Sequence, residues 1–226
     1  MVSERSSVSD FLAGMRDCLP VSVSIFAYAL VFGVLARQKG LAPLEVMTMS
    51  GLAFSGAAQF VVLDLWSAPL PLWPIVLATL IVSLRYLLIC ASCLPLFVHW
   101  PRGRAILGMF LVTDENWAVT MGRPRPSAAH MLGGGVLVYL VWTLSTTAGS
   151  VIGTAVNDPA RWGLDFAFTA TFLALLIGMR RGTRDLLPWA VAAVVAIVAS
   201  HLLPGKWYIL VGGIIGSLAG VVRRDD

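Results

Sequence analysis

Residues 110–120 read FLVTDENWAVT, and this stretch decides how often the chain crosses a membrane. Asp114, Glu115 and Asn116 follow one another here, with long apolar stretches on both sides. Ionisable side chains at membrane depth are costly, and they therefore mark a substrate or ion pathway or a buried pair. If the stretch instead lies at the membrane surface, the same residues form an acidic turn in contact with water.

The composition predicts an all-α, polytopic integral membrane protein with seven or eight transmembrane helices. Hydrophobic residues make up 58% of the chain, charged residues only 12%, and the mean hydropathy is +0.84. Soluble domains carry about twice as much charge. Within lipid, helices satisfy every backbone polar group internally. The net charge of +4 fits arginines beside membrane spans and does not indicate a nucleic-acid surface.

The whole chain, 1–226, is expected to form a single transmembrane domain, preceded by an interfacial N-terminal segment over 1–17. The apolar stretches that predict its spans fall at about 20–36, 44–66, 71–98, 104–121, 131–156, 163–179, 185–203 and 206–222.

An internal repeat is expected, with one half at about 18–122 and the other at about 130–224. Residues 53–56 read AFSG and residues 167–170 read AFTA, an offset of 114 positions. Many secondary transporters are built from two such halves, with broken helices at their junction. Four similar residues are also a plausible coincidence, so the repeat depends on the structure.

The topology depends on whether 104–121 crosses the membrane. If it does, eight spans result, and nine Lys and Arg residues lie inside against six outside. If it does not, seven spans result with the N-terminus outside, and the balance is eleven against four. The positive-inside rule therefore favours seven spans and inverted halves. Both solutions place the C-terminus in the cytoplasm.

A polar stripe of small residues is predicted on the helix at 44–66. Gly51, Ser55 and Gln59 recur every four residues, and Gly56 widens the stripe. At the offset of 114, Thr169 is the counterpart of Ser55, so both halves carry a hydroxyl at the equivalent position. Close helix packing explains such a stripe as well as substrate binding does.

Arg85 is the sharpest single candidate, since it lies at the midpoint of a predicted span over 72–98. Such a helix spans about 40 Å, which exceeds the roughly 30 Å hydrocarbon core, so the side chain cannot easily reach water. It should face a carboxylate or a water-filled cavity. A guanidinium binds a carboxylate through two parallel hydrogen bonds, which suits a substrate carboxylate. A purely structural ion pair is the alternative.

The two acidic residues are the natural complement of Arg85, but a continuous helix separates them. Asp114 flanks a polar face formed by Thr113, Asn116, Trp117 and Thr120, whereas Glu115 points about 100° further round. We therefore expect Asp114 on the polar path. Glu115 is expected to pair with Arg85 or with a partner subunit, unless the backbone breaks here.

The cysteines and histidines give no metal or redox signal. Cys90 and Cys93 have a CxxC spacing inside an apolar run, where cysteine behaves as a small hydrophobic residue. The histidines at 99, 130 and 201 lie far apart without ligand neighbours, which predicts packing or interfacial roles. We expect no cofactor and no metal.

Two residues and five segments along the chain carry a resemblance to a known family. They are Gly14 with Pro20, FGVLARQKGL (32–41), EVMTMSGLAFSGAAQF (45–60), VSLRYLLICASCLP (82–95), TDENWAVT (113–120) and GLDFAFTATFLALL (163–176). Together they resemble the AzlC family of branched-chain amino-acid permeases, the large subunit of a two-component exporter. Ser83 departs from the family, which often carries Asn two residues before the arginine, and Tyr86 replaces an expected polar residue such as histidine.

The resemblance implies export of branched-chain and similar apolar amino acids across the bacterial inner membrane, driven by an ion gradient. It also implies a small AzlD-like membrane subunit as partner, with protons as a candidate coupling ion. On this hypothesis Arg85 binds the substrate carboxylate, and Asp114 or Glu115 binds the ammonium group or carries the proton. The other expected substrate-binding residues are Ser55, Gly56, Gln59, Asn116 and Thr169.

Three other functions stay open at this point. The chain could be a channel or carrier for another small solute, or a scaffold subunit whose partner carries the path. An intramembrane enzyme needs a nucleophile and a base within reach of each other, and only Asp114 and Glu115 are adjacent. We therefore expect a transporter and no enzyme.

Overall fold

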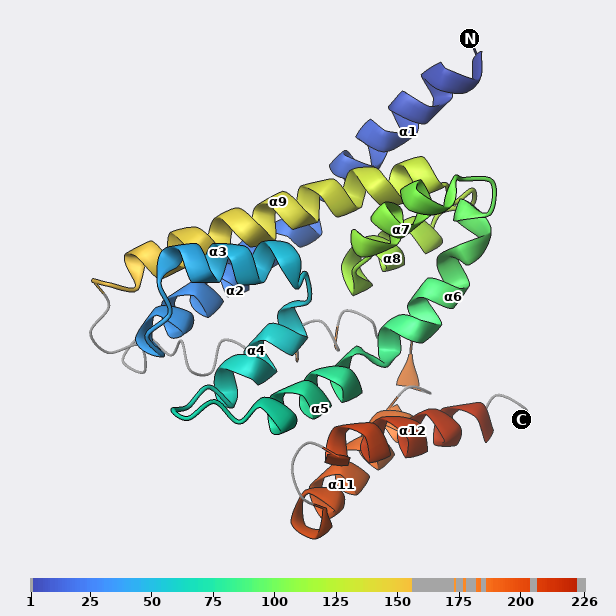
Figure 1. Ribbon diagram of the computed structural model, residues 1–226. Helices are drawn as coiled ribbons and strands as arrows, with labels where there is room; N and C mark the ends of the chain where they lie inside the picture. The colour runs from blue at the N-terminus through green and yellow to red at the C-terminus, as the bar shows by residue number, and fades with distance from the viewer. Residues whose placement is uncertain are drawn as a thin grey trace. The chain divides into compact units, whose positions relative to one another are not determined.

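The computed structural model is helical throughout the part of the chain that it describes, namely residues 2–155, 173, 177, 182–183, 186–203 and 207–222 (Figure 1). In chain order the helices are α1 (Val2–Asp17), α2 (Leu19–Gln38), α3 (Pro43–Leu52), α4 (Gly56–Asp64), α5 (Leu72–Ser83), α6 (Arg85–Phe97), α7 (Arg102–Phe110), α8 (Asp114–Met121), α9 (Ala128–Ile152), α11 (Leu186–Leu202) and α12 (Trp207–Val222).

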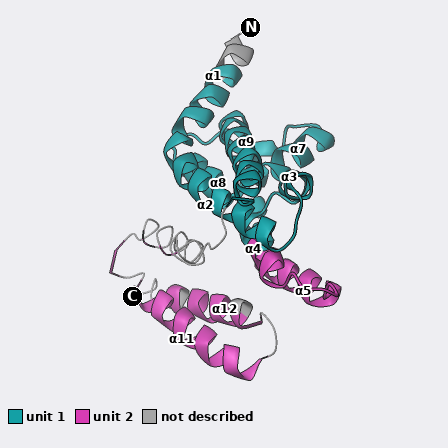
Figure 2. Ribbon diagram, turned by 90° about the vertical axis from the view of Figure 1, so that its left-hand side faces the viewer, with its two compact units in different colours: residues 1–59, 85–168 teal, residues 60–84, 169–226 magenta. Residues whose placement is uncertain are grey.

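The helices form two compact units (Figure 2). Unit 1 comprises residues 1–59 and 85–168, and unit 2 comprises residues 60–84 and 169–226. This division follows contacts and is not the pair of halves expected from the offset of 114. Residues 167–170, the counterpart of the AFSG segment, lie outside the described residues. The internal repeat therefore stays a prediction.

Helix α9 is the long central element of unit 1, and α1, α2, α3 and α8 pack along it (Figure 1). Glycines allow these close approaches. A Cβ atom on Gly14 of α1 would overlap the carbonyl oxygen of His130, and one on Gly33 of α2 would overlap that of Thr146. Small residues that let backbones meet are typical of membrane helix pairs. Tight packing against α9 therefore positions α1 and α2 in unit 1.

Local sequence explains the turn between α2 and α3. Gly40 adopts a φ of 92°, a conformation that L side chains rarely reach. The backbone amide of Leu41 then donates to the carbonyl of Ala36 at 3.1 Å, which ends α2. Pro43 opens α3, and the Glu45 carboxylate accepts from the backbone amide of Ala42 at 2.7 Å.

Three of the predicted spans are broken, and broken helices were expected in a transporter of this kind. The helix expected at 44–66 is interrupted at residues 53–55, the one at 71–98 at Leu84, and the one at 104–121 at residues 111–113. The four-residue stripe of Gly51, Ser55 and Gln59 is therefore not one helix face, because Gly51 belongs to α3 and Gln59 to α4. The carbonyl of Gly51 instead accepts a hydrogen bond from the Tyr139 hydroxyl at 3.1 Å.

The break before α8 has a clear cause. The Thr113 hydroxyl accepts from the backbone amide of Asn116 at 3.4 Å, and the Asn116 side chain accepts from the backbone amide of Thr113 at 2.8 Å. This reciprocal capping box supplies the hydrogen bonds that a continuing helix would otherwise make. The sequence TDEN thus starts a helix, although hydropathy alone predicts the middle of one.

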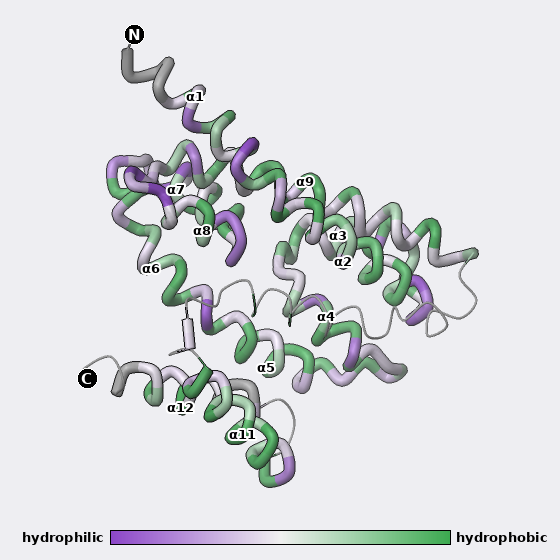
Figure 3. The backbone as a smooth tube through the Cα atoms, turned by 180° about the vertical axis from the view of Figure 1, so that it is seen from behind, coloured by the Kyte–Doolittle hydropathy of each residue, from purple (hydrophilic) through white to green (hydrophobic). Residues whose placement is uncertain are grey.

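Two described helices, α2 and α9, are long and apolar enough to cross a membrane. Helices α5 and α6 make a third span if the broken pair is counted as one. Figure 3 shows hydrophobic residues along these helices and along α11 and α12. These elements confirm an α-helical membrane protein.

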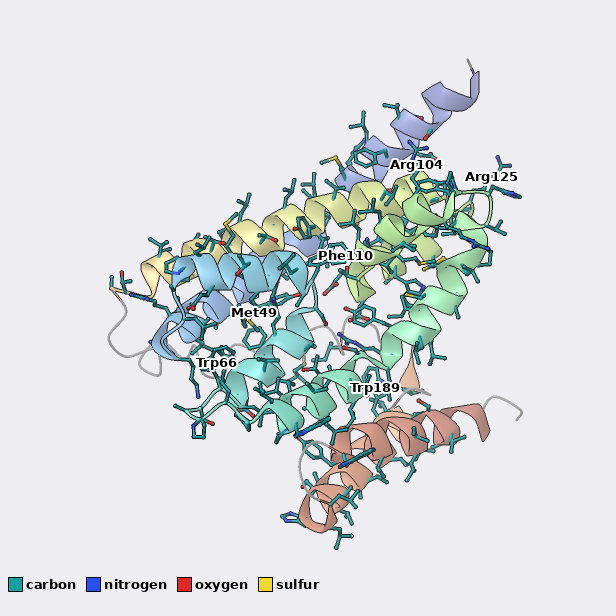
Figure 4. All side chains as sticks on the ribbon, viewed as in Figure 1. Met49, Trp66, Arg104, Phe110, Arg125 and Trp189 are labelled. Carbon is teal, nitrogen blue, oxygen red and sulfur yellow. The ribbon has the colours of Figure 1, made fainter. Side chains whose placement is uncertain are left out.

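The segment at 104–121 forms two short helices instead of one span. Helices α7 and α8 have nine and eight residues, about 14 and 12 Å, each well below the membrane core. Arg104 and Arg125, from the two ends of this segment, lie at the same end of unit 1 (Figure 4). The chain therefore enters and leaves this segment at one end of the unit.

In unit 2, α11 and α12 form a close pair, and α12 also contacts α5. Small residues again line the crossing. Gly212 and Gly216 of α12 lie directly against Ala192 and Ala196 of α11. The GxxxG spacing of the two glycines is a common signature of packed membrane helices.

Candidate functional site

The three breaks carry most of the residues that the sequence singled out. Gly56 is the first residue of α4, Arg85 of α6 and Asp114 of α8. The first backbone amides of a helix have no partner within it, and they favour negative charge. Transporter sites often use such broken helices to hold charged parts of a substrate. All three positions belong to unit 1.

Arg85 and Asp114 form an ion pair. Nη1 of Arg85 lies 2.9 Å from Oδ2 of Asp114, and the side chains are 37% and 38% exposed. The sequence left the partner of Glu115 open between Arg85 and a partner subunit, whereas the structure pairs Arg85 with Asp114. Nε of Arg85 is buried and has no hydrogen-bond partner in the described part of the chain. The guanidinium therefore keeps a free donor beside its carboxylate.

Glu115 points away from Asp114, as expected for adjacent residues of a helix. Its Oε1 atom accepts a hydrogen bond from the Tyr28 hydroxyl of α2 at 3.4 Å. The sequence analysis missed Tyr28. A tyrosine inside an apolar helix was the available signal, since its hydroxyl must find a partner. The two acids thus contact two different helices, α6 and α2.

Asn116 is fully buried, and its side chain is occupied by backbone groups. Nδ2 donates to the carbonyls of Leu111 at 2.8 Å and Met131 at 3.2 Å, while Oδ1 accepts from the amide of Thr113. An amide has two N–H donors and one oxygen acceptor, so these bonds use both donors and the oxygen. Asn116 thus fixes the break and fastens α8 to α9.

Gln59 behaves differently, although it is just as buried, with 1% of its surface exposed. Its Oε1 atom accepts from the indole N–H of Trp142 at 2.9 Å. Because an indole N–H can only donate, the orientation of the amide is fixed and Nε2 faces away from Trp142. Nε2 has no partner among the described residues. Two N–H donors are therefore buried and free.

Tyr86, Trp142 and Ser55 extend this group of residues. The Arg85 guanidinium lies 5.3 Å from the ring of Tyr86, and the Trp142 ring lies 5.3 Å from that of Tyr28. The backbone carbonyl of Ser55 accepts from the backbone amide of Gln59 at 3.0 Å, and the Ser55 hydroxyl is buried without a partner among the described residues. The members of this group, which we call the polar ring, are Tyr28, Ser55, Gln59, Arg85, Tyr86, Asp114, Glu115 and Trp142.

Gly56 and the neighbouring aromatic residues shape the apolar side of the polar ring. A Cβ atom on Gly56 would lie 3.0 Å from the Trp142 ring, so only glycine leaves the indole in place. Phe54 lies 5.1 Å from Tyr139, and Phe110 lies 6.1 Å from both. Thr169, the remaining candidate, lies outside the described residues.

Comparisons with known proteins agree with this picture. The AzlC protein family matches residues 20–156, while no solved structure matches the chain. The inner membrane protein YgaZ of Escherichia coli is 27% identical over 94% of this chain and 90% of its own. An uncharacterized membrane protein of Archaeoglobus fulgidus is 30% identical over 93% and 92%. The branched-chain amino acid transport protein AzlC of Bacillus subtilis is 24% identical over 75% and 69%. The chain is a membrane protein of the AzlC family.

Proposed function

We propose that the chain is the large subunit of a secondary exporter of branched-chain and similar apolar amino acids in the bacterial inner membrane. An ion gradient drives it, and a small AzlD-like membrane subunit completes it. The name of the Bacillus subtilis relative supports the substrate class, and that of the Escherichia coli relative supports the location in the inner membrane.

The Arg85–Asp114 pair is the observation that carries this proposal. An amino acid bears a carboxylate and an ammonium group on the same carbon atom, so it can enter a salt bridge and satisfy both partners. The substrate carboxylate takes the Arg85 guanidinium, and the ammonium group takes the Asp114 carboxylate. The net charge of the site stays unchanged, which avoids stranding a charge at membrane depth.

The free donors of the polar ring complete the carboxylate site. Nε of Arg85 and Nε2 of Gln59 are buried without partners among the described residues, and both can donate to an oxygen. Leaving a buried donor unpaired costs about 1–3 kcal/mol. A ligand that supplies the missing acceptor recovers that free energy. Both donors suit a carboxylate and neither suits a cation.

Aromatic groups of unit 1 supply the surface for the substrate side chain. Trp142 packs between Tyr28 and Phe32, with ring centroids 5.3 and 5.8 Å away. Burying each additional methylene group is worth about 0.8 kcal/mol, which favours leucine, isoleucine and valine over alanine. Asp114 and Glu115 are the candidate carriers of a coupling proton within the polar ring.

The topology follows the same proposal. Since α7 and α8 are too short to cross, and since Arg104 and Arg125 lie at one end of unit 1, the segment at 104–121 is a re-entrant pair. This supports seven spans, inverted halves, an extracellular N-terminus and a cytoplasmic C-terminus. Cysteine labelling at Arg125 and at His99 tests it, because the re-entrant arrangement requires both positions on the same side.

Efflux of leucine and valine from cells tests the function. The variants Arg85→Ala and Asp114→Asn each lack half of the salt bridge, and we expect them to abolish efflux at normal membrane abundance. Arg102→Ala is the matched control, since it removes an exposed arginine at the start of α7. Normal efflux in both site variants would refute the assignment. If a protonophore leaves the efflux rate unchanged, a passive pore would instead be favoured.

A further inference from the structure

A second ionisable cluster lies in unit 1 and is not part of the polar ring. His130, near the start of α9, is fully buried, and both of its ring nitrogens have partners. Nε2 lies 3.1 Å from Oδ2 of Asp17, the last residue of α1, and Nδ1 lies 2.8 Å from Oγ1 of Thr120 in α8. The imidazole therefore ties three helices together. The sequence suggested a packing or interfacial role for it.

The chemistry of the partners fixes where the hydrogens lie. An ionised Asp17 can only accept, so Nε2 carries a hydrogen. In the neutral ring Nδ1 is then an acceptor, and the Thr120 hydroxyl donates to it. When the ring is protonated, Nδ1 becomes a donor. The hydroxyl must then turn away, and a threonine in a helix can donate to the carbonyl four residues earlier. The cluster is therefore fully hydrogen-bonded with or without the extra proton.

Asp17 is the exposed member of the cluster. Its side chain is 44% exposed, whereas His130 and Thr120 have no exposed surface. Uptake of one proton changes the charge of the Asp17–His130 pair from −1 to 0. When this proton resides on the carboxylate, Asp17 donates to Nε2 and the neutral ring carries its hydrogen on Nδ1, so Nδ1 is a donor to Thr120 in this state as it is in the imidazolium.

The cluster is connected to the polar ring by α8. This helix carries Thr120 near its end and Asp114 and Glu115 at its start. Its length is only about 12 Å, and Thr120 follows Asp114 by six residues, about 9 Å along the helix axis. Cys18 lies within the electrostatic range of both Asp17 and Glu115. Burial, with the charges of these two carboxylates, raises the pKa of the Cys18 thiol to about 11, so the thiol stays neutral and does not compete for the proton.

The charges of the elements around the imidazole come from α1, α7, α8 and the residues after α8. Helix α9 has no other ionisable side chain apart from Tyr139. The charged residues on the elements packed around its first turns are Glu4, Arg5, Asp10, Arg16 and Asp17 of α1, Arg102 and Arg104 of α7, Asp114 and Glu115 of α8, and Arg123 after α8. Asp17 is the residue whose charge contacts the ring, so its removal isolates the effect.

We propose that the Asp17–His130 pair is a proton-binding site of this protein, and that its loading sets the hydrogen bond by which Thr120 holds α8 against α9. This inference rests on the proposed function, in which the pair couples a proton gradient to the acidic residues of the polar ring. Neither group touches the substrate, so both are positioning residues.

Nitrogen NMR of histidine-labelled protein tests the site without any transport assay. The chain has only three histidines, and the exposed His99 and His201 serve as internal references. We expect the nitrogen signals of His130 to report proton uptake on acidification, with the ring hydrogen on Nε2 at high pH. Asp17→Asn keeps an acceptor but removes the charge, so the midpoint should fall by about one pH unit.

The matched control is Asp10→Asn. Asp10 is another carboxylate of α1, and it accepts a hydrogen bond from the Ser127 hydroxyl at 2.8 Å. This variant should leave the His130 midpoint in place. A His130 ring that stays neutral over the pH range in which His99 titrates would overturn the proposal. So would a midpoint that Asp17→Asn does not move.

Transport in proteoliposomes that contain the chain and its small partner tests the coupling. Asp17→Asn should reduce leucine accumulation driven by a pH gradient at least fivefold, yet leave leucine exchange without a gradient intact. Asp10→Asn should retain both. Gradient-driven accumulation at the wild-type level in Asp17→Asn would overturn the coupling role. If wild-type protein moves no apolar amino acid, the proposed function fails, while the NMR titration still decides whether the proton site exists.

Discussion

Asn116 and Gln59 are two buried amides of unit 1 with opposite hydrogen-bond states. Asn116 is 0% exposed and uses both donors and its oxygen on backbone groups. Gln59 is 1% exposed, and it uses only its oxygen, on Trp142. In a membrane, a side-chain amide whose donors and acceptor are all hydrogen-bonded holds helices together, whereas one with free donors is available to bind a ligand. The difference separates structural from binding residues where burial alone does not.

The largest expected effect is on stability, at Asn116. In Asn116→Ala the carbonyls of Leu111 and Met131 and the amide of Thr113 lose their partner. Each unpaired buried group costs about 1–3 kcal/mol, so we expect a loss of at least 3 kcal/mol in the free energy of unfolding. Thermal unfolding of the purified protein in detergent measures it. Asn116→Asp, which keeps one acceptor, should lose less. A wild-type melting temperature in Asn116→Ala would break the comparison.

The next effect is on binding, at Gln59. Gln59→Met removes both free donors at similar volume and also the acceptor of the Trp142 indole. These two changes offset each other in stability, so the unfolding free energy should shift by less than about 1 kcal/mol. Substrate affinity should fall about tenfold, as expected for one lost hydrogen bond to a charged group.

Binding of leucine by isothermal calorimetry, together with thermal unfolding, separates the two effects. Thr48→Val is the matched control, since it deletes a polar group at an exposed position of α3. A Gln59→Met protein that melts far below the wild type would place Gln59 with Asn116 as a structural residue.

Sequence reasoning found the ionisable members of the polar ring and missed their aromatic supports. Arg85, Asp114 and Glu115 stand out because charge is rare inside apolar stretches. Tyr28 and Trp142 do not, because aromatic residues are common there. Their roles depend on which polar atom each ring reaches, and that is a property of the folded helices. Asn116 was also expected to bind substrate, because it is a polar residue inside an apolar stretch. In the structure its side chain instead forms hydrogen bonds with backbone groups.

The helix breaks were the other feature that the sequence could not locate. Hydropathy averages over about 19 residues, so an interruption of one to three residues disappears in the average. At residues 111–113 the signal was nevertheless present, since Thr113 and Asn116 have the spacing of a capping box. At Leu84 no residue of this kind marks the break. The break at residues 111–113 makes Asp114, the partner of Arg85, the first residue of α8.

A smaller effect is expected at Trp142, which orients Gln59 without touching the substrate carboxylate. In Trp142→Phe the indole donor is lost, so the Gln59 amide is free to turn over and present its oxygen. We expect substrate affinity to fall about fivefold, with little change in the maximal rate of efflux. Phe97→Leu is a suitable control, since Phe97 is a buried aromatic residue that packs on Trp100 and is not a member of the polar ring. A lower maximal rate at unchanged affinity would contradict an orienting role.

The smallest effect is expected at Gly56, and it tests whether the free donors of Gln59 depend on the exact place of the indole. A methyl group at this position would lie 3.0 Å from the Trp142 ring, so the ring must give way by a few tenths of an ångström. The shift lengthens the 2.9 Å bond to Gln59 without removing it. Gly56→Ala should therefore lower leucine affinity two- to threefold, a change of about 0.5 kcal/mol.

The double variant Gly56→Ala with Trp142→Phe should bind leucine with the same affinity as Trp142→Phe alone, because the smaller ring leaves room for the methyl group. Additive losses in the double variant would mean that Gly56 acts on the substrate directly and not through Trp142.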